Sequence, residues 1–264
     1  MIENIMLTAK KTIFIAALSL AASMNPASAK DGKPTVVLVH GAFAESSSWS
    51  GVLTRLIAKG YPVIVAANPL RGVRSDGAYV ASVLESIESP IVLVGHSYGG
   101  TVISNAVNGN KNIKTLVFVA AFAPDAGETA GELSARYPGG TLGPTLAPPV
   151  ALPHGGKDLY IQQDKFRAQF AADVPAADAK LMAGTQRPIT EAAINEPSGA
   201  PAWKSVPSWF IYGSRDLNVP EAAQSFMAKR AGAKETVVVK GASHVVMVSH
   251  PDAVAKIIEH AAAN

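Results

Sequence analysis

"PIVLVGHSYGGTVI", residues 90–103, combines a strand, a sharp turn and the start of a helix. Its first half is apolar and β-branched, as in a buried strand, and its second half has the small residues of a helix start. Gly95 and Gly99 flank Ser97 between the two halves. A serine between glycines at such a turn is typical of a nucleophile elbow, because only small neighbours fit there. The stretch lacks G-x-G-x-x-G and the lysine of a phosphate loop, so we expect Ser97 to be a nucleophile.

Strand-length apolar runs alternate with helix-length amphipathic segments along most of the chain. The expected strands are residues 35–40, 61–66, 91–94, 115–120, 208–212 and 235–239. The expected helices are residues 48–59, 75–87, 99–107, 219–230 and 251–263. Alternation of this kind predicts an α/β fold, with a mostly parallel sheet and helices on both of its faces.

The alternation stops between about residues 123 and 206, where the chain is irregular and rich in glycine and proline. Two pieces within it have a helical pattern, near residues 128–136 and 165–182. A stretch this long is not a plain connection between two core elements. We therefore expect a helical cap, inserted after the fourth core strand of a single domain that spans residues 30–264.

Composition narrows the classes of partner. The 264 residues carry a net charge of +3, and no run of lysines and arginines is longer than a pair such as Lys10-Lys11, so the chain does not resemble a nucleic-acid-binding protein. The chain has no cysteine, which excludes disulfides and thiolate metal sites. Its six histidines lack a spacing such as H-E-x-x-H, so we expect no metal.

The first 29 residues have the pattern of a secretory signal peptide. Lys10-Lys11 precede an apolar run over residues 12–24, which is short for a bilayer span, and Ala27-Ser28-Ala29 matches a cleavage site. We expect cleavage after Ala29, a periplasmic or secreted protein that starts at Lys30, and no stable membrane association afterwards. Whether Met1 or Met6 is the initiator stays open.

A serine nucleophile needs a general base, and His244 is the best placed of the six histidines. It lies in the loop after the last strand, and loops at the carboxyl ends of parallel strands converge on one crevice. His40 ends a strand, and His96 is expected on the opposite side of its strand end from Ser97. The other histidines lie in the insertion or at the last helix: His154, His250 and His260.

The base in turn needs an acid to orient it, and two aspartates compete for this role. Asp216 follows the next-to-last strand, beside the loop that carries His244, whereas Asp125 follows the fourth strand. We favour Asp216. The alternative roles are a turn or cap for Asp216 and a helix N-cap for Asp125. The order Ser97, Asp216, His244 is the one found in α/β hydrolases.

Acyl transfer also needs donors for the developing oxyanion. The backbone N–H of Tyr98, directly after the nucleophile, is the first candidate. Ala42 is the second, because Gly41 lets the loop after the first strand turn inward. Phe43 and Phe122 are expected to line the substrate pocket, although core packing would also explain them.

Five segments resemble the α/β-hydrolase superfamily and, within it, the group of plant methylesterases, hydroxynitrile lyases and related bacterial esterases. They are VLVHGAFAESSSW, GHSYGGTVI, FVAAFAPDAGE, YGSRDLNVP and GASHVVMVSHP. The resemblance extends over nearly the whole chain after residue 29. It implies an α/β-hydrolase fold with a helical cap, a Ser97–His244–Asp216 triad, Ala42 and Tyr98 as oxyanion donors, and no cofactor.

Two positions depart from the lyases of this group. Those lyases carry a lysine directly after the catalytic histidine and a threonine in the oxyanion loop, where this chain has Val245 and Gly41. A valine cannot stabilise departing cyanide. We therefore expect an exported serine hydrolase acting on small, fairly apolar carboxylic esters. The alternatives are perhydrolase or cofactor-free haloperoxidase activity, and a ligand-binding protein with low turnover. The sequence leaves open the natural substrate, its acyl chain and the oligomeric state.

Overall fold

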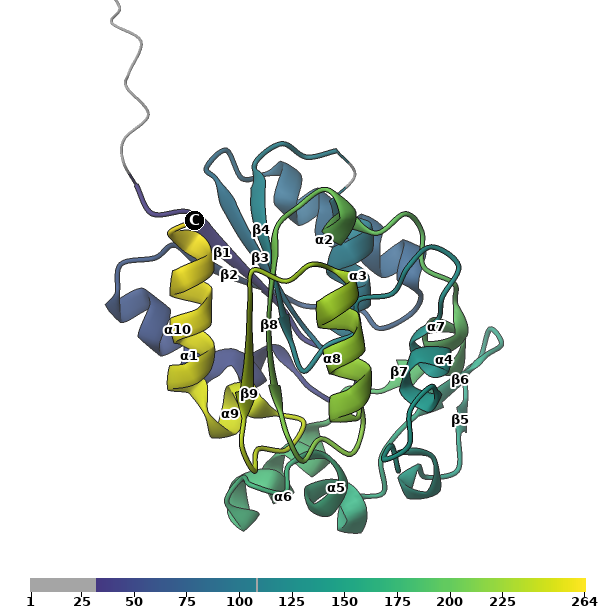
Figure 1. Ribbon diagram of the computed structural model, residues 1–264. Coiled ribbons are helices and arrows are strands. Elements are labelled where there is room, and N and C mark those ends of the chain that lie inside the picture. The colour runs from purple at the N-terminus through teal and green to yellow at the C-terminus, as the bar shows by residue number, and fades with distance from the viewer. Residues whose placement is uncertain (1–31, 108) are drawn as a thin grey trace, which may run out of the picture. The chain divides into compact units, whose positions relative to one another are not determined.

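Six parallel strands form the central sheet, in the order β2-β1-β3-β4-β8-β9 (Figure 1). The computed structural model describes residues 32–107 and 109–264, so the predicted signal peptide lies outside the described residues. The strands are β1 (Thr35–Val39), β2 (Val63–Ala66), β3 (Ile91–His96), β4 (Ile113–Val119), β8 (Ser208–Gly213) and β9 (Glu235–Val239). Every residue of β1, β3 and β8 is buried, as their continuous apolar runs predict.

Helices cover both faces of this sheet (Figure 1). They are α1 (Ser50–Ala58), α2 (Val73–Glu85), α3 (Tyr98–Ala106), α8 (Glu221–Arg230), α9 (Val246–Ser249) and α10 (Pro251–Ala262). Helices α1 and α10 pack together on one face, and α2 packs on α3 on the other. The predicted α/β architecture is therefore confirmed, with boundaries within about three residues of those expected.

The insertion between β4 and β8 contains more than helices. Its helices are α4 (Ala130–Ala135), α5 (Gln163–Phe170), α6 (Ala176–Thr185) and α7 (Glu191–Asn195). The single helix expected over residues 165–182 is two helices, because Pro175 has no N–H to continue the first one. An antiparallel sheet of three strands was not expected: β5 (Val150–Ala151), β6 (Lys157–Leu159) and β7 (Ile189–Thr190). Strands of two or three residues are too short to leave an alternating pattern.

Three single turns of 3-10 helix complete the described chain. They are η1 (Ser46–Trp49), η2 (Gly143–Thr145) and η3 (Ala202–Lys204). The first leads into α1, the second lies in the cap, and the third leads back from the cap toward β8.

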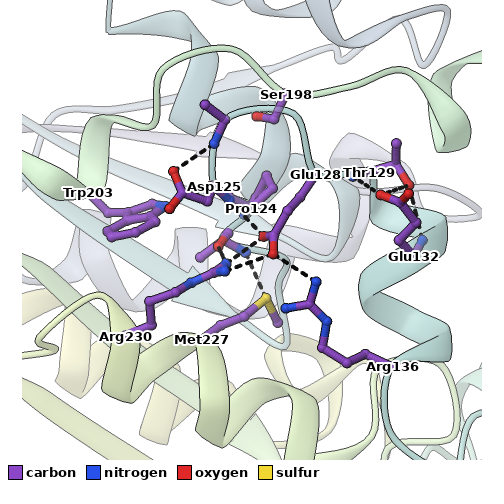
Figure 2. A network of polar contacts seen from close by, with 12 residues as sticks. Pro124, Asp125, Glu128, Thr129, Glu132, Arg136, Ser198, Trp203, Met227 and Arg230 are labelled. Atoms are coloured by element: carbon purple, nitrogen blue, oxygen red, sulfur yellow. Dashed lines mark hydrogen bonds and ion pairs between the residues drawn. The ribbon is translucent and has the colours of Figure 1, made fainter.

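The start of the insertion is tied to helix α8 of the core by a cluster of polar contacts (Figure 2). The Glu128 carboxylate accepts hydrogen bonds of 2.7 and 2.9 Å from Arg230 of α8 and lies 2.8 Å from the Arg136 guanidinium. Arg230 also donates to the Ala123 carbonyl, and Trp203, at the end of the insertion, donates to the Pro124 carbonyl. Both ends of the insertion therefore meet at one point beside α8.

Candidate active site

Four chain segments meet at the carboxyl edge of the sheet, where parallel α/β folds place their ligand sites. Ser97 lies between β3 and α3, and Ala42 follows β1. Asp216 follows β8 and His244 follows β9. All the residues expected to carry the chemistry therefore come from loops of the central sheet.

The backbone at Ser97 is strained, as a sharp strand-to-helix turn requires. Its φ of 53° and ψ of −125° lie in a region that residues other than glycine seldom adopt. A Cβ at Gly95 would lie 2.6 Å from the Gly99 carbonyl oxygen, and one at Gly99 would lie 2.5 Å from that of Val39. The glycines are therefore needed for close approach of strand, turn and helix.

Ser97, His244 and Asp216 form one chain of hydrogen bonds. His244 Nε2 lies 2.9 Å from Ser97 Oγ, and His244 Nδ1 lies 2.7 Å from Asp216 Oδ2. The side chains of His244 and Asp216 are almost completely buried. The rival acid, Asp125, lies elsewhere, paired with Lys204 near the protein surface. The geometry is that of a nucleophile, a base and the acid that orients the base.

Asp216 accepts three hydrogen bonds besides the one from His244. The backbone N–H groups of Asn218 and Val219 donate to Oδ1, at 2.8 and 2.9 Å. The side chain of Gln224, in α8, donates to Oδ2 at 2.9 Å. Both carboxylate oxygens are thus fixed in direction. Sequence reasoning missed Gln224, whose one signal is a polar residue in a predicted helix after the Asp216 loop.

The loop after β1 lies against the elbow. A Cβ at Gly41 would lie 2.6 Å from Ser97 Cβ and 3.1 Å from the Tyr98 nitrogen, so the loop approaches because residue 41 is glycine. Within the described residues, neither the Ala42 nor the Tyr98 backbone N–H donates to a protein acceptor. Phe43, at a φ of 59°, donates its N–H to the Arg187 carbonyl of the cap. Two free donors are therefore available beside Ser97.

The side chain of Tyr98 is anchored away from the elbow. Its hydroxyl donates to Asp76 Oδ2 at 3.0 Å, and the fully buried Asp76 carboxylate also accepts from the N–H groups of Arg71 and Gly72. Burial and the neighbouring Asp76 raise the pKa of Tyr98, so its hydroxyl stays protonated. Burial likewise raises the pKa of Asp76. The hydrogen bond to Asp76 therefore anchors Tyr98, whose backbone N–H is one of the two free donors beside Ser97.

His96 lies closer to the hydrogen-bonded chain than expected. Its ring centroid is 4.8 Å from that of His244, and its Nε2 lies 3.3 Å from the His244 carbonyl oxygen. Burial, and then the nearby His244, lower the pKa of His96 well below its ordinary value. His96 therefore stays neutral and adds no charge beside His244, and its contact was missed because the sequence placed it on the far side of its strand end.

A pocket opens above Ser97. The expected residues Ala42, Phe43, Tyr98 and Phe122 line it. The remaining lining comes mainly from the insertion and the Asp216 loop: Ala130, Ser134, Leu142, Phe170, Ile189, Ile194, Asn218 and Val219, together with Ser97 and His244. The lining is mostly apolar and carries no carboxylate, lysine or arginine, so it suits an uncharged ligand.

Residues 32–107 and 109–264 contain no group of three His, Cys, Asp or Glu side chains arranged to hold a metal ion. In the same part of the chain, no helix is both long and apolar enough to cross a membrane.

A family model described as alpha/beta hydrolase family matches residues 36–257. The chain belongs to the alpha/beta hydrolase family. Similar curated proteins include alpha/beta hydrolase nvfD of Aspergillus novofumigatus, 26% identical over 87% of this chain and 97% of the relative. Salicylic acid-binding protein 2 of Nicotiana tabacum is 27% identical over 84% of this chain and 94% of the relative. The resemblance to the methylesterase and hydroxynitrile lyase group is therefore confirmed.

Solved structures of alpha/beta hydrolases share the fold. Polyneuridine aldehyde esterase superposes with a TM-score of 0.74 at 20% identity, over 86% of this chain and 98% of that one. A pyrethroid hydrolase from Sphingobium faniae has a TM-score of 0.69 at 22% identity, over 87% and 97% of the two chains. At these identities the likeness concerns the fold.

Proposed function

We propose that this alpha/beta hydrolase is a serine esterase that cleaves small, uncharged, fairly apolar carboxylic esters through an acyl-enzyme. The observation that carries the proposal is the continuous hydrogen-bonded chain from Ser97 through His244 to Asp216. It lies beneath a mostly apolar pocket, beside two N–H groups without a protein acceptor among the described residues.

In the first half-reaction Ser97 Oγ attacks the ester carbonyl carbon while His244 Nε2 takes the hydroxyl proton. The imidazolium is stabilised by Asp216, and the oxyanion accepts hydrogen bonds from the Ala42 and Tyr98 N–H groups. The C–O bond to the alcohol then breaks, and His244 gives its proton to the departing oxygen. In the second half-reaction water takes the place of the alcohol, and the same groups release the carboxylic acid and free Ser97.

Two named relatives support ester hydrolysis. Methylesterase 2 of Arabidopsis thaliana is 25% identical over 83% of this chain, and a pyrethroid hydrolase of Sphingobium wenxiniae is 26% identical over 84%. Both names denote hydrolases. The apolar pocket lining fits ester substrates without charge on either side of the scissile bond.

A lyase is the nearest competing interpretation, because alpha-hydroxynitrile lyase of Arabidopsis thaliana is also 25% identical over 81% of this chain. Cyanohydrin cleavage places negative charge on departing cyanide, which a nearby cation would stabilise. The residue directly after His244 is the fully buried Val245, and the pocket lining supplies no lysine or arginine. Ester hydrolysis develops its charge on the carbonyl oxygen, where the two N–H groups lie.

A panel of p-nitrophenyl esters of rising chain length, assayed with wild type and Ser97→Ala, tests the proposal. We expect turnover of short esters, loss of turnover in the variant, and labelling of Ser97 alone by a fluorophosphonate in mass spectrometry. Cyanide released from mandelonitrile as fast as p-nitrophenol from esters would instead favour a lyase. Products that need peroxide would favour a perhydrolase, and ligand binding without turnover a binding protein.

We also propose that the mature enzyme begins at Lys30 and works in the periplasm or outside the cell. The support comes from the sequence of residues 1–29 alone. N-terminal sequencing of protein from an exporting host tests it, and recovery of intact residues 6–29 in the cytoplasm only would refute it.

A further inference from the structure

We propose that Gln224 is a positioning residue for the Ser97–His244–Asp216 chain, acting through Asp216 to set how strongly His244 holds a proton. The inference rests on the proposed function, since it concerns the same site. It adds a fourth side chain, on helix α8, to the three that carry the reaction.

The orientation of the Gln224 amide is fixed by its neighbours. Its Nε2 lies 2.9 Å from Asp216 Oδ2 and 2.8 Å from the Val219 carbonyl oxygen. Both partners are acceptors, so only the NH₂ end of the amide can face them. A flipped amide would set its oxygen against a carboxylate and a carbonyl. Gln224 is completely buried, so water does not offer another partner from the protein surface.

This orientation of the Gln224 amide is energetically unfavourable for its oxygen, and packing alone does not explain why the residue is a glutamine. With Nε2 turned to Asp216, the buried Oε1 of Gln224 has no hydrogen-bond partner among the described residues. A buried polar atom without a partner is destabilising, and an apolar side chain of similar size would avoid it. Here the side chain is a glutamine, one turn into α8, with its donor on the carboxylate that is hydrogen-bonded to His244.

Gln224 affects His244 because both side chains are hydrogen-bonded to the same oxygen of Asp216. Asp216 Oδ2 accepts both from Gln224 and from His244 Nδ1, so the amide withdraws part of the charge that would otherwise stabilise the imidazolium. Among the described residues, His96 also faces His244, and it stays neutral. Asp173 accepts a hydrogen bond from Ser243, the residue before His244. Arg215 and Glu221 line a hollow on the outer side of Asp216, and among the described residues neither side chain hydrogen-bonds to its carboxylate.

The experiment compares Gln224→Met with Gln162→Met in ester hydrolysis across pH. Gln162 is the control: it is half-buried, its amide donates to the Leu146 carbonyl within the cap, and it does not line the pocket. We expect Gln224→Met to move the acid limb of kcat/KM upward by about 1 pH unit, because Asp216 Oδ2 then no longer shares its charge with the amide. KM should change less than twofold, because Gln224 is not a pocket-lining residue.

Gln162→Met should leave the acid limb in place. A Gln224→Met enzyme with an unmoved acid limb, or the same movement in both variants, would overturn the proposal. If Gln224→Met does not fold, Gln224→Glu is the test variant in its place. Its carboxyl can donate to Asp216 only while protonated, so kcat/KM should gain a falling limb as the new acid ionises. Absence of that limb would also overturn the proposal.

A readout without turnover separates this inference from the proposed function. The downfield Nδ1–H resonance of His244, followed by proton NMR against pH, should titrate about 1 pH unit higher in Gln224→Met than in wild type. An unshifted titration refutes the role of Gln224 even in an active esterase. A shifted titration in a protein that hydrolyses no ester supports that role and refutes the proposed function instead.

Discussion

Replacing Glu128 by glutamine should lower the free energy of unfolding by about 2–3 kcal/mol at pH 7. Burial by itself would raise the pKa of Glu128, but hydrogen bonds from Arg230 and the Asp125 N–H, together with Arg136, lower it from 4.5 to about 2. Lowering a pKa by one corresponds to about 1.36 kcal/mol, so the change at Glu128 contributes about 3 kcal/mol. The side chain is only 17% exposed, so solvent screens it little.

The pH dependence gives the prediction its sign. A carboxyl whose pKa is lowered on folding adds stability that is complete above its unfolded value, near 4.5, and is lost as the pH falls toward 2. Glutamine cannot ionise, so the variant lacks this contribution at every pH. The stability difference between wild type and Glu128→Gln should therefore be largest at neutral pH and shrink between pH 4.5 and 2.

Guanidinium unfolding at a series of pH values measures this difference. Asp125→Asn is the control, because its pair with Lys204 is exposed and such pairs contribute at most about 1 kcal/mol. A Glu128→Gln protein as stable as wild type at pH 7, or one whose deficit does not change with pH, would refute the reasoning. The first result would mean that Arg230 finds an equally good partner without the carboxylate, and the second that the deficit does not come from the ionisation of Glu128.

Three further predictions concern the site. Asp216→Asn should lower kcat by about 10⁴-fold with little change in the circular dichroism spectrum, whereas Asp125→Asn should cost far less; the reverse ranking would move the acid to Asp125. Phe43 lines both the pocket and an outer groove of about 820 Å³, so Phe43→Ala should extend hydrolysis to longer p-nitrophenyl esters, and an unchanged chain-length profile would contradict this. Tyr98→Phe removes a hydrogen bond to buried Asp76 and should cost about 1.5–3 kcal/mol in urea unfolding; no loss would mean that the contact is dispensable.

The core of the fold is predictable because its signals are local. Continuous apolar runs mark the buried strands, and the glycines around Ser97 mark the turn that positions it. The order of the strands then brings the loops of Asp216 and His244 together, since carboxyl ends of parallel strands share one edge. Ser97, Asp216 and His244 could therefore be chosen as candidate site residues from the sequence alone.

The pocket and its supports are less predictable, because they depend on contacts between distant segments. Leu142, Ile189 and Ile194 reach the pocket from an insertion whose short strands and broken helices leave no periodic pattern. Gln224 is distinguished only by a hydrogen bond across the α8–loop contact. The contact of His96 with His244 was not expected, because a strand end does not reveal how its last side chain turns.

Helix α8 contacts both the start of the cap and the loop of Asp216, two segments that lie far apart in the sequence. Near its start Gln224 contacts Asp216, and at its last residue Arg230 holds Glu128 at the entrance of the cap. These two positions are six residues apart on one helix, a distance of about 9 Å along its axis. The start of the cap and the loop of Asp216 are thus both anchored on α8. Engineering that transplants a cap from a relative to change substrate range should therefore transplant α8 with it, as a single module.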